Sequence, residues 1–155
     1  MAHNSILDFV SGLLPDQPDA TRMLNDLFRA MHTWDDLVDK DKPVSEADIN
    51  GAFVALMVHV PANPFYQRHF AQLHPLISAA TIDWLAANDM ERTGAVLDRE
   101  IAFITRSNYA MLVMKVIEVC RGYGFAAAAA ADVRRNIHQE GLAAYSADLD
   151  KQKGN

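Results

Sequence analysis

The sequence predicts an all-α protein, a single compact bundle of about six helices. Hydrophobic residues recur at three- and four-residue spacing, prolines and capping residues separate these stretches, and no alternating strand pattern of useful length occurs. The chain has 155 residues, 50% of them hydrophobic, so it is long enough and apolar enough to bury a core. We therefore expect one helical domain over residues 1–155.

The first half of the chain predicts four helices. We expect them at about residues 4–14, 19–40, 45–60 and 64–88. Ser45 stands three residues before Asp48, a spacing typical of a capping box, and Pro61 should close the helix that this box opens. Asn63-Pro64 is the start signal of the fourth helix, which Pro75 should kink or divide.

The second half predicts a buried central helix and a shorter final one. Residues of about 91–121 are the most hydrophobic, with apolar side chains on nearly every face between 101 and 119, so this helix should be surrounded by the others. Gly122 should end it. The six alanines at 126–131 should open a helix reaching about residue 140, and the tail from about 142 should fray.

Charge and composition exclude several classes of protein. The net charge of -6 and the scattered lysines and arginines argue against nucleic acid and against anionic membranes as partners. A single cysteine, Cys120, argues against a disulfide-stabilised secreted domain. The first residues lack the pattern of a signal peptide, and the longest apolar region contains too many polar residues to span a membrane. We expect a cytoplasmic protein.

An acidic motif at the end of the second predicted helix indicates a candidate metal site. Asp35 and Asp39 are four residues apart and project on the same side of a helix, with Asp36 beside them and His32 one turn earlier. Like charges at this spacing repel, and acids at a helix C-terminus oppose the helix dipole. A cation would compensate, and carboxylates suit Mg²⁺ or Mn²⁺. Asp35, Asp36 and Asp39 are the candidate ligands, with His32 supporting them.

The same residues carry a resemblance to a known family. The sequence Asp35-Asp36-Leu37-Val38-Asp39 resembles the DDxxD motif of class I isoprenoid and terpenoid synthases, an all-α family whose motif holds Mg²⁺ ions that bind a substrate diphosphate. The resemblance implies that Asp35 and Asp39 ligate metal and that Asp36 supports them. Family members are usually much longer, and this chain lacks a second acidic motif. With its Trp34-Asp35-Asp36 segment, the short helical chain also resembles uncharacterised bacteriophage proteins.

An alternative needs no metal. The four acids Asp35, Asp36, Asp39 and Asp41 would then form a solvated helix end, paired with Lys40, Lys42 or an arginine elsewhere in the chain.

Polar residues on the predicted central helix suggest a second part of such a site. Asp98, Thr105, Asn108 and Lys115 recur at spacings of seven, three and seven, so one helix would align them in a polar stripe. Arg106 and Lys115 are the candidate phosphate ligands. The alternative is a set of satisfied hydrogen bonds and a lysine whose stem covers apolar surface.

Two functions remain open, and the sequence leaves undecided whether the protein is an enzyme. The first is a non-enzymatic binding or accessory protein, such as a small viral protein, that contacts a partner protein through its acidic helix end and aromatics such as Trp34, Phe65 or Tyr66. A homodimer is a further alternative, because the alanine-rich helix could supply a close self-packing face. The second is a Mg²⁺-dependent protein that binds a small-molecule diphosphate or cleaves its ester. The absence of a complete catalytic set favours the first.

Overall fold

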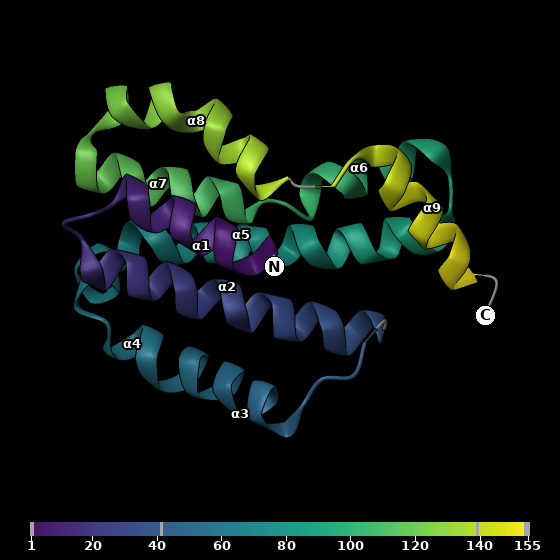
Figure 1. The fold of residues 1–155 in the computed structure, drawn as a ribbon, viewed down its shortest axis with the longest axis horizontal. Coiled ribbons are helices and arrows are strands. Elements are labelled where there is room, and N and C mark those ends of the chain that lie inside the picture. Colours follow the sequence, from purple (N-terminus) through teal and green to yellow (C-terminus); the bar gives the residue numbers. More distant parts are fainter. Residues whose placement is uncertain (1, 41, 139, 154–155) are drawn as a thin grey trace. The chain divides into compact units, whose positions relative to one another are not determined.

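The computed structural model of the chain confirms the all-α fold class (Figure 1). It describes residues 2–40, 42–138 and 140–153, and these contain helices and connecting segments but no strand. Six helices have 12 residues or more, in agreement with the predicted number: α1 (Ala2–Leu13), α2 (Pro18–Asp39), α5 (Pro64–Thr93), α7 (Tyr109–Arg121), α8 (Tyr123–Ile137) and α9 (Leu142–Lys153).

Contacts divide the chain into two compact units. One unit is Leu7–Ala71, and the other combines the residues through Ile6 with the chain from Gln72 onward. Both α1 and α5 cross the boundary, so the division does not coincide with a linker. The single domain over residues 1–155 therefore stays a prediction.

In the unit Leu7–Ala71, α2 lies beside a second helical rod (Figure 1). The apolar stripe predicted for α2 is buried over its first two thirds: Ala20, Met23, Leu24, Leu27, Phe28 and Ala30. The helix ends at Asp39, because Lys40 adopts the left-handed conformation (φ 56°) and donates its N–H to the Asp36 carbonyl.

The second rod, which we call the α3–η1 rod, consists of α3 (Glu46–Val54), a π-helical segment η1 (Ala55–His59) and the short α4 (Val60–Ala62). The capping box is confirmed, since the Ser45 hydroxyl accepts the N–H of Asp48 and the Asp48 carboxylate accepts from Ser45. Pro61 does not close the helix as predicted. The wider π turn, in which Val60 donates to Ala55, changes the backbone that precedes the proline, so the rod continues for two residues beyond Val60.

The start of α5 also matches its prediction. Asn63 precedes Pro64, and its side-chain oxygen accepts the N–H groups of Phe65 and Tyr66 at 2.9 and 3.1 Å. A kink is present, but it lies at His69 (φ −112°, ψ 17°) and not at Pro75. The six-residue offset places the distortion in the second turn of the helix.

In the unit that contains Gln72 onward, the predicted helix of about 91–121 is divided, which corrects the sequence analysis. The turn after α5 contains Gly94 (φ 76°), a conformation that glycine adopts without steric cost, and α6 (Val96–Thr105) then precedes a turn and α7. Only α7 is the buried segment expected; α6 exposes Val96 and Leu97 at 73% and 64%.

The end of this unit is more ordered than the sequence suggested. α8 begins at Tyr123, ahead of the alanines, and packs beside α7 (Figure 1). The segment expected to fray from about 142 forms α9, which packs on α6 and buries Tyr145 and Leu149. Two buried side chains four residues apart give this helix an anchored face, which explains the correction. Residues 154–155 lie outside the described chain.

Candidate functional site

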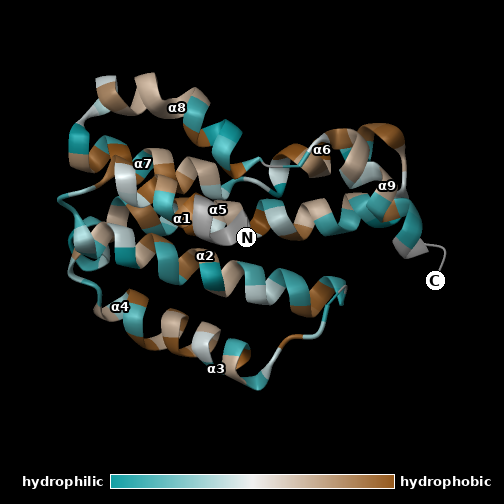
Figure 2. Ribbon diagram, in the orientation of Figure 1, coloured by the Kyte–Doolittle hydropathy of each residue, from teal (hydrophilic) through white to brown (hydrophobic). Residues whose placement is uncertain are grey.

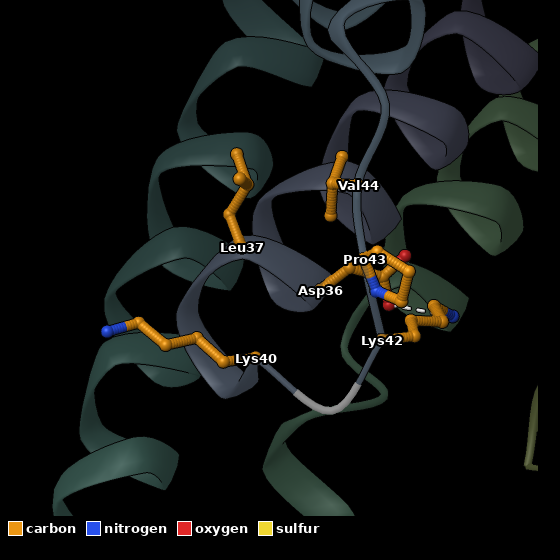
Figure 3. A pocket seen from close by; sticks show the side chains of 6 residues that line it. All are labelled: Asp36, Leu37, Lys40, Lys42, Pro43 and Val44. Atoms are coloured by element: carbon orange, nitrogen blue, oxygen red, sulfur yellow. Dashed lines mark ion pairs between the residues drawn. The ribbon is translucent and has the colours of Figure 1, made fainter.

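The acidic end of α2 borders an open hollow of about 450 Å³ (Figure 3). The C-terminal turn of α2 and the segment leading to α3 form its walls. Its lining residues are Asp36, Leu37, Lys40, Lys42, Pro43 and Val44. The hollow is therefore a concave surface with one carboxylate, two ammonium groups and apolar walls.

The Asp36 carboxylate is paired within the chain. Lys42 Nζ lies 2.7 Å from Asp36 Oδ1, while the Lys40 side chain extends in another direction (Figure 3). This ion pair relieves part of the repulsion that the sequence analysis identified, and for Asp36 it matches the alternative of an acidic helix end balanced by lysine. Asp41, the fourth acid of that alternative, lies outside the described residues.

The other candidate ligands are neighbours of these lining residues in the sequence, but they do not line the hollow. Asp35 and Asp39 are half-buried, and the ring of His32 packs edge-on against Phe28 with 4.2 Å between the centroids. Among the described residues, no group of three or more histidine, cysteine, aspartate or glutamate side chains is placed to hold a metal ion. The site of Asp35, Asp36 and Asp39, with Mg²⁺ or Mn²⁺ as the cofactor, stays a prediction.

The two predicted phosphate ligands belong to the other compact unit, and each has a carboxylate partner there. Arg106 Nη1 lies 2.6 and 2.7 Å from the two oxygens of Glu91, and Lys115 Nζ lies 3.1 Å from Glu118. Their positive charges are therefore already balanced by acids within their own unit.

The predicted polar stripe is not a single face, because its members lie on two helices and on the turn between them. Asp98 in α6 accepts a hydrogen bond from Thr93, and Thr105 donates to the carbonyl of Ile101 at 3.0 Å. Asn108, just before α7, donates to Asp83. These groups are satisfied individually, as the alternative in the sequence analysis proposed.

A set of apolar side chains on the α3–η1 rod was not identified from the sequence. The rod buries Ala55 and Val60, yet it exposes neighbouring large side chains, which we call the apolar face: Phe53, Val54, Leu56, Met57 and Val58. Met57 is 72% and Phe53 61% exposed. Much of the rod is correspondingly brown in Figure 2.

Gly51 lies in the same rod, in the middle of α3. It is exposed, its φ is not positive, and a Cβ built on it meets no atom within 4 Å. A glycine in a helix interior destabilises the helix by roughly 0.5–1 kcal/mol relative to alanine. Among the described residues, neither steric crowding nor backbone conformation requires it, so the described fold does not account for this glycine.

A sequence signal for the apolar face was available. Residues 52–58 contain no polar side chain, and a helix packed against one neighbour cannot bury every side of such a run. The prediction that the aromatic residues Phe65 and Tyr66 are exposed for a partner was wrong, because both are buried, at 5% and 8% exposure. Trp34, at 36%, is exposed.

The fold also brings together a serine and a histidine that are 31 residues apart. Ser107 Oγ lies 2.9 Å from His138 Nδ1, and the ring of Phe103 packs against the imidazole. Burial, and then the charge of Arg134, lower the pKa of His138. This pair could not be predicted from the sequence, because nothing in the local sequence relates the turn before α7 to the end of α8. Burial raises the pKa of Cys120, which favours its neutral thiol.

Comparison of the chain with protein-family profiles, curated proteins and solved structures found no match. In the described part of the chain, no helix combines the length and the apolar character needed to cross a membrane.

Proposed function

We propose that this chain is a small non-enzymatic binding protein that contacts a partner protein through the apolar face of the α3–η1 rod. The observation that supports this proposal is the exposure of five consecutive or nearly consecutive large apolar side chains on one rod. Isolated exposed apolar residues are normal, but a contiguous group is typical of an interaction surface.

The size of the apolar face supports the proposal. With the exposures given above, its side chains present on the order of 500 Å², toward the upper end of the largest patches on ordinary monomers. Burying this area against a partner would remove it from water at a gain of about 25 cal/mol per Å² before the costs of association. The surface is large enough for a specific contact.

Site-specific photo-cross-linking tests the proposal. A photoreactive phenylalanine analogue replaces Met57 in the full chain, and a matched protein carries it at Arg22, which is also exposed and in the same compact unit. We expect illumination in an extract of the cells that make the protein to give a discrete adduct from position 57 but not from position 22.

The adduct should disappear when Gly51→Leu is added, because the larger side chain would hold the partner away from the apolar face. Equal labelling from both positions, or an adduct that survives Gly51→Leu, would contradict the proposal.

The hollow at the end of α2 favours a second candidate function, Mg²⁺-dependent binding of a small-molecule diphosphate. Asp36 is of the ligand type that Mg²⁺ prefers, and Lys40 and Lys42 are suited to phosphate oxygens. If the ligand binds only the folded state and its free concentration is 100 times its Kd, the free energy of unfolding should rise by about 2.7 kcal/mol. Thermal unfolding with Mg²⁺ and pyrophosphate measures this.

Two variants make the second test specific. Asp36→Asn should abolish the stabilisation by Mg²⁺, while Lys42→Met should weaken the pyrophosphate effect and retain the Mg²⁺ effect. An unchanged unfolding temperature in the wild type, at saturating Mg²⁺ and pyrophosphate, would exclude this candidate.

A further inference from the structure

We infer that the occupant of the apolar face is a second copy of this chain, so that two α3–η1 rods pack against each other in a symmetric dimer. The inference rests on the proposed function, because it names the partner of the same surface. It adds two observations, the unexplained glycine in α3 and the distribution of charge along the rod.

The first observation is that the exposed small side chains lie in the N-terminal half of the rod and the large ones follow them, so an antiparallel second copy would place the small residues of one rod opposite the large residues of the other. Ala47 and Gly51 are one turn apart and both are exposed, and Phe53 and Met57 follow them. Small residues let a second helix backbone approach closely, and large apolar residues then fill the space beside it. A second copy of the rod supplies both kinds of residue, as an isologous contact requires.

Gly51 becomes understandable in this arrangement. Within the described chain it costs helix stability and meets no neighbour at the position of a Cβ. An approaching helix from another molecule would occupy that open space. The glycine would then have a role in the contact between molecules, although it has none in the described fold of a single molecule.

The second observation concerns charge. Residues 43–62 contain no lysine or arginine, and the acids of the rod, Glu46 and Asp48, both lie at its N-terminal end. An antiparallel pair of rods keeps the two acidic ends apart, whereas a parallel pair would bring like charges together. We therefore infer an antiparallel contact.

A basic amphipathic helix is the competing occupant, and the rod suits it less well. Glu46 and Asp48 are the only acids in residues 43–62, and both lie before the apolar face, so that face offers no carboxylate to a basic partner. Two apolar faces together would bury on the order of 1,000 Å², about the lower limit for a specific interface. The dimer should accordingly be of moderate affinity and depend on concentration.

Sedimentation equilibrium of the purified full chain tests the inference. We compare the wild type with Gly51→Leu and with a matched control, Gly124→Leu. Gly124 is also exposed, lies in α8, and has open space around its Cβ position. Leucine is a better helix former than glycine at both positions, so neither variant should lose its fold.

We expect the wild type to change from monomer to dimer as its concentration rises from low micromolar to near-millimolar. Gly51→Leu should raise the dimer dissociation constant by at least about tenfold, and Gly124→Leu should leave it unchanged. Circular dichroism of each variant confirms its helix content.

A wild type that stays monomeric over this range would overturn the second-copy inference, and so would a dimer that both variants weaken equally. The cross-linking experiment distinguishes failure of the dimer from failure of the proposed function. An adduct from position 57 whose added mass differs from that of this chain would preserve the proposed function and exclude the dimer, whereas no adduct and no dimer would exclude both.

Discussion

At the scale of single residues, the least expected feature is a buried charged cluster between α5, α6 and α9. Glu91 is 8% exposed, and its carboxylate accepts hydrogen bonds from Arg106 and from the Tyr145 hydroxyl. Burial, followed by the hydrogen bond to Glu91, raises the pKa of Tyr145, which keeps the hydroxyl protonated as a donor. The arginine that the sequence suggested for phosphate therefore has a structural role in this unit.

Replacement of Arg106 by methionine should destabilise the fold strongly. The substitution leaves the Glu91 carboxylate buried without its guanidinium, and such a loss costs about 3–5 kcal/mol. Arg92→Met is the matched control, because its 2.6 Å ion pair with Asp89 is exposed on both sides and should contribute less than about 1 kcal/mol. Urea unfolding monitored by circular dichroism measures both. Equal losses would show that burial does not determine the energy of these pairs.

His138 should make stability depend on pH. Its pKa is lowered mainly by burial, so the folded state favours the neutral imidazole. This contribution is fully present above the ordinary histidine pKa of about 6.5 and is lost as the pH falls through the lowered folded value. We expect stability to decline on acidification and His138→Asn to flatten that decline.

A titration by nuclear magnetic resonance should also show that Arg134→Gln raises the His138 pKa; an unchanged midpoint would exclude the Arg134 contribution.

At the scale of elements, Asn63 connects the start of α5 to the start of α2. Its oxygen caps α5, and its amide nitrogen donates to the Asp19 carbonyl at 2.9 Å. Asn63→Ala should lower the free energy of unfolding by about 1–3 kcal/mol, since a cap and a buried partner are both lost. Asn63→Asp keeps the cap and removes the donor, so it should cost less. Identical losses in urea unfolding would show that the cap contributes nothing.

Three helix boundaries were the features most accurately predicted from the sequence. The capping box at Ser45, the start at Asn63-Pro64 and the end at Gly122 depend on neighbouring residues, so a local pattern suffices to predict them. The buried stripe of α2 was predicted for the same reason.

Features that depend on distant residues were missed. The turns around α6 interrupt an apolar run that looked continuous, and α9 is ordered by Tyr145 and Leu149, whose burial requires residues far along the chain. The partners of Arg106 and Asn108 are 15 and 25 residues away. Local periodicity contains no information about such pairs, so the charge balance of these side chains appeared only with the fold.

At the scale of the whole molecule, acidic charge and apolar surface occur together. A net charge of -6 keeps separate molecules apart at long range, yet the α3–η1 rod presents an apolar face without a lysine or arginine beside it in residues 43–62. Repulsion of this kind is screened by salt, while contacts between apolar groups are not. Self-association through the apolar face should therefore strengthen as ionic strength rises.

The apolar face should be replaceable without loss of the fold. Phe53→Glu combined with Met57→Lys keeps the net charge and removes two exposed side chains, so the free energy of unfolding should change by no more than about 0.5 kcal/mol. The same variant should stay soluble at higher ammonium sulfate concentrations than the wild type, because its molecules no longer share an apolar contact.

Val60→Glu is the matched control. Val60 is buried in the same rod at 4% exposure, and an unpaired charge there should unfold the protein. If the Phe53 and Met57 double variant also lost several kcal/mol, those side chains would be covered within the folded chain, and they could not form a surface for a partner.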